Sequence, residues 1–237
     1  IATADPTSQV SILRGSVGSR ADEPIAALAF DPLGDYVVSV GTRGGVGVWG
    51  VDAGGLVAEA DVAAKLISPT CVAWTPDGSK VLVGGDAGAV VVAREAWGVI
   101  RELEGGHDEA DDEDEGDSGG VGATPAPGSS GGGAPPRRGV TAISVSPAGG
   151  YVATGDAAGV VVVWNLGTAE VVDRWRLEAG AVRQIVWHPA AAALIVLDDG
   201  GHWAVIGDIL PDHMPRSYDP TPSPAVALVA AAAEGTG

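Results

Sequence analysis

The sequence has 237 residues, a formal net charge of −18, 37 Gly and 16 Pro. This acidity argues against a chain that grips a nucleic-acid backbone by itself. The frequent Gly and Pro favour many short elements over long helices, and no apolar run reaches the roughly 18 residues needed to cross a bilayer. The sequence starts at Ile1 without a recognisable signal peptide, so we expect it to be part of a longer polypeptide.

A pattern of alternating apolar residues that ends in Pro recurs along the chain. It takes the forms AALAFDP at 26–32, TCVAWTP at 70–76, TAISVSP at 141–147 and RQIVWHP at 183–189. Such alternation is typical of a β-strand. The outer pairs of these prolines are 44 and 42 residues apart, but the middle pair is 71 apart. The surplus of about 28 residues is explained by a low-complexity segment at 104–138 inside an otherwise regular repeat.

Further apolar runs follow each of these prolines at constant distances. The second runs are 36–40, 80–84, 151–155 and 193–197, the third are 46–49, 90–93, 161–164 and 203–206, and weaker fourth runs are 56–62, 98–103 and 170–175. Four antiparallel strands in each unit of about 40–45 residues are the signature of a β-propeller blade. A β-sandwich is the alternative, whereas a doubly wound α/β fold would need a helical period between the strands.

We therefore predict an all-β fold, an incomplete β-propeller with about four and a half four-stranded blades of a probable seven. The predicted segments are a part blade at 1–15, blades at 25–62, 69–103, 140–176 and 182–208, an acidic insert at 104–138, and a disordered linker at 211–237. Because an open propeller leaves sheet edges unpaired, we expect upstream blades or another chain to complete the ring. The aromatic residues at equivalent places should pack between blades; they are Phe30, Trp49, Trp74, Trp164 and Trp187.

Two glycine-rich stretches, GGDAG at 84–88 and GDAAG at 155–159, raise the alternative of a phosphate-binding loop. A phosphate loop needs a following Lys and a helix, whereas a strand-like run of valines follows here. We interpret both stretches as turns in which Asp86 and Asp156 accept hydrogen bonds from turn amides. Cys71 is expected to be a buried thiol, and no His lies at metal-ligand spacing. We therefore expect no enzymatic activity, no metal and no cofactor.

The acidic run at 107–117 is the strongest polar feature of the sequence. Its simplest interpretation is a solvated, disordered loop. The functional alternative is that it attracts basic partners such as histone tails from the top face of the propeller, beside the channel. The candidate protein-binding residues are Arg43, Asp108, Glu109, Asp111, Asp112, Glu113, Asp114, Glu115 and Asp117.

The repeated units resemble WD repeats in their strand pattern, their TPDG and SPAG turns and their Val-Trp endings. They depart from WD repeats because the expected Trp-Asp is replaced by Trp49-Gly50, Ala93-Arg94, Trp164-Asn165 and Ile206-Gly207. The Gly-His that opens a WD repeat is absent at Gly15-Ser16. The resemblance therefore implies that the Asp–His–Ser–Trp hydrogen-bond network of strong repeats is incomplete.

The order of the units over residues 1–208 is similar to the N-terminal propeller of the WD-repeat and HMG-box DNA-binding protein family. The pieces that carry this similarity are REAW at 94–97 and VWHP at 186–189. The resemblance implies a nuclear, non-enzymatic hub that links the replicative helicase to DNA polymerase α-primase and supports chromatin and cohesion functions. In that family, trimerisation and most partner docking belong to a second propeller and DNA binding to an HMG box, neither of which lies in this sequence. The alternative is a WD-repeat scaffold subunit of another nuclear or cytoplasmic complex.

Overall fold

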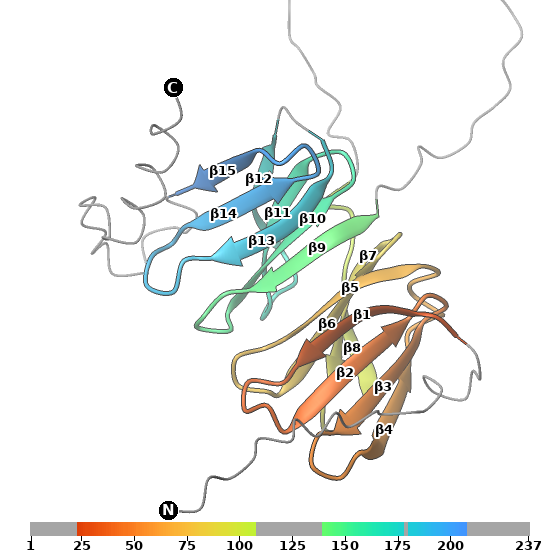
Figure 1. The fold of residues 1–237 in the computed structure, drawn as a ribbon. Coiled ribbons are helices and arrows are strands. Elements are labelled where there is room, and N and C mark those ends of the chain that lie inside the picture. The colour runs from red at the N-terminus through yellow and green to blue at the C-terminus, as the bar shows by residue number, and fades with distance from the viewer. Residues whose placement is uncertain (1–22, 108–138, 178–179, 208–237) are drawn as a thin grey trace, which may run out of the picture.

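The computed structural model describes residues 23–107, 139–177 and 180–207, and in these residues all regular elements are strands. The strands form four antiparallel sheets (Figure 1). Sheet 1 contains β1 (Ile25–Phe30), β2 (Tyr36–Gly41), β3 (Gly45–Gly50) and β4 (Gly55–Asp61), and sheet 2 contains β5 (Pro69–Trp74), β6 (Lys80–Gly85), β7 (Gly88–Ala93) and β8 (Gly98–Leu103). Sheet 3 contains β9 (Val140–Val145), β10 (Tyr151–Asp156), β11 (Val160–Asn165) and β12 (Val171–Arg176), and sheet 4 contains β13 (Val182–Trp187), β14 (Leu194–Asp198) and β15 (Trp203–Ile206).

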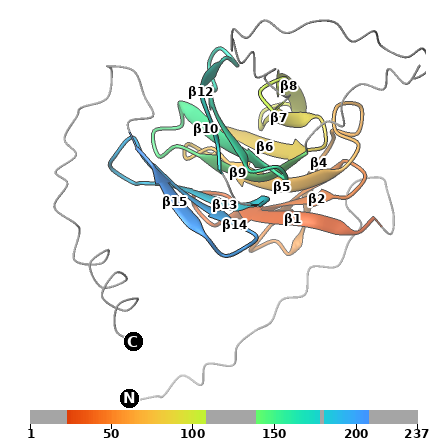
Figure 2. The same ribbon diagram turned by 90° about the horizontal axis from the view of Figure 1, so that it is seen from above.

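Within each sheet the strands lie in chain order, each antiparallel to the next. The first strands of successive sheets contact one another, β1 with β5, β5 with β9 and β9 with β13, and they follow one another through the middle of the molecule (Figures 1 and 2). The predicted all-β fold with four-stranded antiparallel blades is confirmed. Sheet 4 differs from the expected full blade because it has three strands within the described residues.

The turn between the first and second strands has the same conformation in the first three sheets. Gly34, Gly78 and Gly149 occupy the same place in this turn, with φ between 66° and 79°. This left-handed conformation is easily adopted only by glycine, which explains the Gly that ends the DPLG, TPDG and SPAG stretches. A polar side chain two residues before the turn tip accepts a hydrogen bond from the backbone N–H that begins the second strand, as Ser146 does from Tyr151 at 3.1 Å.

The hydrophobic core is divided into three clusters, one in each space between neighbouring sheets. The cluster between sheets 2 and 3 shows the pattern, because Leu82 and Val91 face Val162 and Trp164 across that space. The central strands contribute to the clusters on both of their faces, and the run Val160–Val163 is buried throughout. Burial of both faces explains why β11 is a continuous apolar run instead of an alternating one. Each sheet is therefore stable only against its neighbours.

Two polar contacts tie successive sheets together at their first strands. The hydroxyl of Thr141 in β9 donates to the carbonyl oxygens of Gly155 at 3.2 Å and of Val182 in the next sheet at 2.5 Å. Thr70 has the equivalent place in sheet 2 and donates to the carbonyl oxygen of Val140 in sheet 3. The indole N–H of Trp187 donates back to the carbonyl oxygen of Ser144 at 3.0 Å, in the same way that Trp74 reaches Ala29 in sheet 1.

The expectation that the recurring aromatic residues are buried is wrong for Phe30. Trp49, Trp74, Trp164 and Trp187 are each less than a tenth exposed, whereas Phe30 is 66% exposed. Phe30 stands at the place of Trp74 and Trp187, on the face of β1 that would meet a preceding sheet. Within the described residues no sheet covers that face. The opposite end of the array is also open, since Ile195 and Val205 pair across β14 and β15 and are both exposed.

We predict that Trp164→Ala lowers the free energy of unfolding by about 3–5 kcal/mol, because a large buried ring leaves a cavity between sheets 2 and 3. The matched control is Trp203→Ala, since the Trp203 ring is 64% exposed and its loss should change stability by less than about 0.5 kcal/mol. Urea unfolding followed by circular dichroism measures both. Equal stability of the two variants would contradict this assignment of the buried face.

Candidate protein-interaction face

The array of sheets has two rims. One rim, here called the connection face, carries the turns between second and third strands together with the segments that lead from one sheet to the next. The β8–β9 connection contains residues 104–139 and so holds the acidic insert. The predicted binding residues between Asp108 and Asp117 lie outside the described residues. Arg43 is exposed on this rim in the β2–β3 turn.

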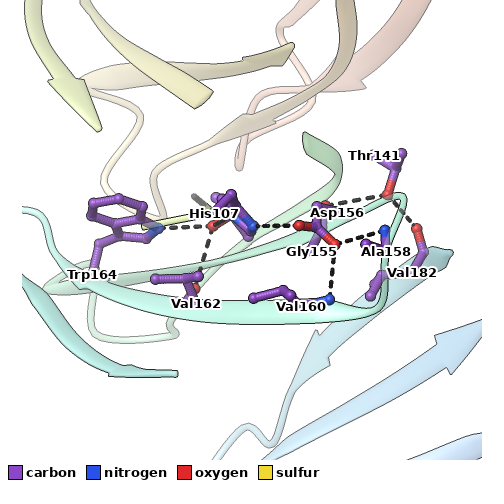
Figure 3. Close-up of polar contacts among 10 residues, drawn as sticks. His107, Thr141, Gly155, Asp156, Ala158, Val160, Val162, Trp164 and Val182 are labelled. Carbon is purple, nitrogen blue, oxygen red and sulfur yellow. Dashed lines mark hydrogen bonds and ion pairs between the residues drawn. The ribbon is translucent and has the colours of Figure 1, made fainter. Parts of the chain in front are cut away.

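The turn 156–159 on the connection face is organised by the carboxylate of Asp156. One oxygen of Asp156 accepts hydrogen bonds from the backbone N–H groups of Ala158 and Val160, both at 2.8 Å (Figure 3). The interpretation of GDAAG as a turn between strands, with Asp156 bound to turn amides, is confirmed. The same expectation is wrong for Asp86, because its carboxylate accepts hydrogen bonds from the backbone N–H groups of Ile67 and Ser68 in the β4–β5 connection.

The second carboxylate oxygen of Asp156 belongs to a buried network of polar side chains. It lies 3.2 Å from Nδ1 of His107, and Nε2 of His107 lies 2.8 Å from the hydroxyl oxygen of Thr154. The indole N–H of Trp164 donates to that same hydroxyl oxygen at 2.7 Å (Figure 3). All four side chains are buried. The Asp–His–Thr–Trp network is thus complete in sheet 3, and the expectation of an incomplete network is wrong there.

His107 was missed by sequence reasoning because the acidic insert separates it from the sheet that it joins. The signal was the dipeptide Gly106-His107, which stands directly before the insert. Gly106 is required at this place, since a β-carbon there would lie 2.5 Å from the ring of Trp164. The acidic run therefore does not begin with a solvated His107. The run begins directly after His107, whose side chain is buried and contacts Asp156 and Thr154 of sheet 3.

The network sets the ionisation of Asp156. Burial by itself would raise the pKa of the Asp156 carboxyl, but His107 and the backbone N–H groups of Val160 and Ala158 outweigh burial and hold the pKa below its ordinary value. Asp198 in the β14–β15 turn is similar, because burial is outweighed by the backbone and side chain of His202. Both carboxylates therefore stay charged at neutral pH and keep their turns closed.

In sheet 1 the backbone N–H groups of the β2–β3 turn also donate to a carboxylate, but that carboxylate comes from a residue that precedes β1. Glu23, which precedes β1, accepts hydrogen bonds from the backbone N–H groups of Arg43 and Gly45, which correspond to Ala158 and Val160. A β-carbon at Gly41, the place of Asp156, would overlap the Glu23 carboxylate. Glu23 is buried, and its Oε2 is without a hydrogen-bond partner among the described residues.

The other sheets keep different parts of the network. In sheet 1, Trp49 donates to the hydroxyl of Ser39 at 2.8 Å, as Trp164 does to Thr154. In sheet 2 the place of Thr154 is taken by Val83. The β6–β7 turn is one residue shorter than its counterparts, so Val92, and not Ala93, pairs where a Trp is expected. In sheet 2 the network is thus replaced by apolar packing.

The remaining chemical candidates do not assemble into a reactive site. Burial raises the pKa of the Cys71 thiol to about 11, so this half-buried Cys is protonated at neutral pH. Among the described residues there is no group of three His, Cys, Asp or Glu side chains placed to hold a metal ion. That same part of the chain contains no helix long and apolar enough to span a membrane.

These sheets, turns and buried network define repeats of the WD class, and a family model described as "WD domain, G-beta repeat" matches residues 134–165. The chain has the architecture of a WD-repeat β-propeller fragment. Along most of its length it is distantly similar to the mouse protein named WD repeat and HMG-box DNA-binding protein 1, at 24% identity over 79% of this chain and 15% of that protein. Angio-associated migratory cell protein from human is 40% identical over 27% of this chain and 14% of its own length.

The fold is also similar to the solved structure of the computationally designed Ika4 protein. The TM-score is 0.57 at 18% identity, with 80% of this chain and 94% of that chain covered. At this identity the similarity concerns the fold alone. The chain spans less than a fifth of the length of either natural relative.

We predict that Asp156→Asn lowers stability at neutral pH and that the difference from wild type shrinks in acid. Because the folded-state pKa of Asp156 is depressed, its contribution is fully present above the unfolded pKa of about 3.9 and is lost as pH falls through the lower folded pKa. Urea unfolding between pH 2 and 7 measures this difference, with Asp52→Asn in the exposed β3–β4 turn as control. A difference that stays constant below pH 4 would contradict the assigned role of the carboxylate.

Proposed function

We propose that this chain is a non-enzymatic protein-interaction scaffold within a nuclear replication-fork adaptor. The observation that carries the proposal is the similarity to WD repeat and HMG-box DNA-binding protein 1, which extends over most of the sheets instead of one repeat. WD-repeat proteins are generally scaffolds, and the described residues offer rigid sheets with variable connections. This is the arrangement by which a fold presents binding loops.

The proposed partners are the replicative helicase and DNA polymerase α-primase, with chromatin binding and cohesion as properties of the parent protein. Direct DNA contact is assigned to parts outside this sequence, because a net charge of −18 opposes phosphate binding. An alternative is a scaffold of another complex, favoured by the higher identity of the 65-residue match to angio-associated migratory cell protein.

Direct binding of the purified chain to reconstituted DNA polymerase α-primase and to the replicative helicase tests the proposal. Biolayer interferometry of each assembly on immobilised chain should give saturable binding to at least one of them. A chain of equal acidity but scrambled sequence is the control, since it would retain only charge-driven attraction. Absence of binding to both assemblies, with the fold verified by circular dichroism, would favour the alternative scaffold.

The acidic insert is proposed as an attachment point for basic segments of partner proteins. His107 is fixed in the buried network on one side of the insert, and on the other side the carbonyl oxygen of Gly139 accepts a hydrogen bond from the backbone N–H of Ala157. Both ends are therefore held on the connection face of sheet 3. Eight carboxylates tethered there attract cations within about one Debye length, roughly 8 Å at physiological salt.

We predict that neutralising these eight carboxylates weakens binding of a histone-tail peptide by at least about tenfold at low salt, since charge attraction supplies the affinity. The variant replaces the Asp and Glu residues between 108 and 117 by Asn and Gln and leaves His107 and insert length unchanged. Fluorescence anisotropy with a lysine-rich histone-tail peptide measures the effect. A second variant with the same residues in scrambled order should bind like wild type. Unchanged affinity after neutralisation would remove this role.

A further inference from the structure

The rim opposite the connection face, here called the turn face, carries a cluster of aromatic residues around one arginine. The guanidinium carbon of Arg94 lies 4.8 Å from the ring centroid of Tyr36 and 5.9 Å from that of Trp74. Trp97 meets Trp74 edge to face, with centroids 6.2 Å apart. These four residues, here called the Arg94 cluster, come from sheets 1 and 2 and include Arg94 and Trp97, the first and last residues of the REAW stretch.

Arg94 is held in place but is not neutralised. It makes no ion pair among the described residues, and one weak hydrogen bond of 3.4 Å joins its Nη1 to the carbonyl oxygen of Gly78. The carboxylate of Asp77, which precedes Gly78, is engaged by its own turn. Asp77 accepts from the hydroxyl of Thr75 at 2.5 Å and from that of Ser79 at 2.7 Å. Since a guanidinium has five N–H donors, most of those of Arg94 remain available.

Trp97 occupies a place where the backbone conformation favours glycine. Gly54, Trp97 and Ala169 have the same position in the turns between third and fourth strands, with φ of 64°, 50° and 64°. In each turn this residue donates its backbone N–H to the fourth residue before it, as Trp97 does to Ala93 at 2.8 Å. A left-handed conformation is unfavourable for a non-glycine residue. The Trp97 ring packs against the apolar cluster between sheets 1 and 2 but is only half-buried, so part of the ring is accessible on the turn face.

An exposed apolar side chain lies beside the cluster. Leu33, at the tip of the β1–β2 turn, is 81% exposed. A β-carbon at Gly78 would lie 3.6 Å from Nη1 of Arg94 and 3.7 Å from Pro32, so the turn of Leu33 and the arginine flank the same glycine. Interface hot spots are enriched in Trp, Tyr and Arg. The Arg94 cluster has this composition and is flanked by the apolar side chain of Leu33.

We propose that the Arg94 cluster and Leu33 bind a segment of a partner protein that carries one carboxylate side chain flanked by basic residues. The carboxylate pairs with the free donors of Arg94 over the aromatic rings. The basic neighbours face Asp77, whose pKa its turn partners Thr75 and Ser79 lower to about 2, and the exposed Glu95. Those two negative charges disfavour a nucleic-acid phosphate backbone at the same place.

This inference rests on the proposed scaffold function but is tested separately from it. A random peptide library displayed on phage is selected against the whole chain, and enriched peptides are measured by fluorescence anisotropy. Enriched peptides should contain Asp or Glu beside Lys or Arg. Arg94→Gln should weaken their binding about tenfold or more, and Leu33→Glu, a change at an exposed turn tip, should weaken it without affecting the fold. Arg176→Gln, at an exposed arginine of sheet 3, should bind like wild type.

A double-mutant cycle completes the test. Changing the peptide carboxylate to an amide should reduce affinity for wild type and leave affinity for Arg94→Gln unchanged. Failure to enrich any peptide, enrichment of peptides without carboxylates, or equal binding to wild type and both site variants would overturn the proposal. Oligonucleotide binding that depends on Arg94 while no peptide binds would also overturn it. These results are distinguishable from failure of the scaffold function, because the helicase and polymerase assays use the wild-type chain and report binding at any of its faces.

Discussion

The packing of each sheet against its neighbours is the constraint on which the rest of this structure depends. The central strands are apolar on both faces, as the buried run Val160–Val163 shows. Water is excluded from those faces only where another sheet covers them. A series of similar sheets covers these apolar faces, because each sheet packs against the next. The sequence can therefore vary most freely in the turns and connections at the two rims. Both proposed binding regions lie on these rims, one on the connection face and one on the turn face.

The residues of the buried polar network differ from sheet to sheet. Sheet 3 keeps the full set around His107, and sheet 1 supplies its carboxylate from Glu23. Sheet 2 has apolar residues at two of the equivalent places, among them Val83. Because burying an unpaired polar group costs more than packing an apolar one, replacement of several members together preserves stability where loss of one member would not. Retention in sheet 3 also fixes the base of the long insert.

Strand order and turn positions could be predicted because they follow from local periodicity. The GDAAG turn and the β11 valines are determined by short-range rules of glycine conformation and apolar burial. The network of sheet 3 could not be placed, since the insert hides the spacing between His107 and Thr154. Glu23 could not be anticipated because its partner amides are about twenty residues away in the chain. The exposure of Phe30 depends on which sheets surround it, which periodicity does not specify.

Hydrogen exchange of the backbone N–H groups tests the central claim, that stability comes from sheets packed face to face. The account predicts slowest exchange in β6, β7, β10 and β11, which are covered on both sides, and fast exchange in β15 at the edge of sheet 4. It also predicts that Trp164→Ala speeds exchange in β7 and β11 together, because they share one cluster. Uniform exchange across all strands, or an effect of Trp164→Ala confined to β11, would contradict the account.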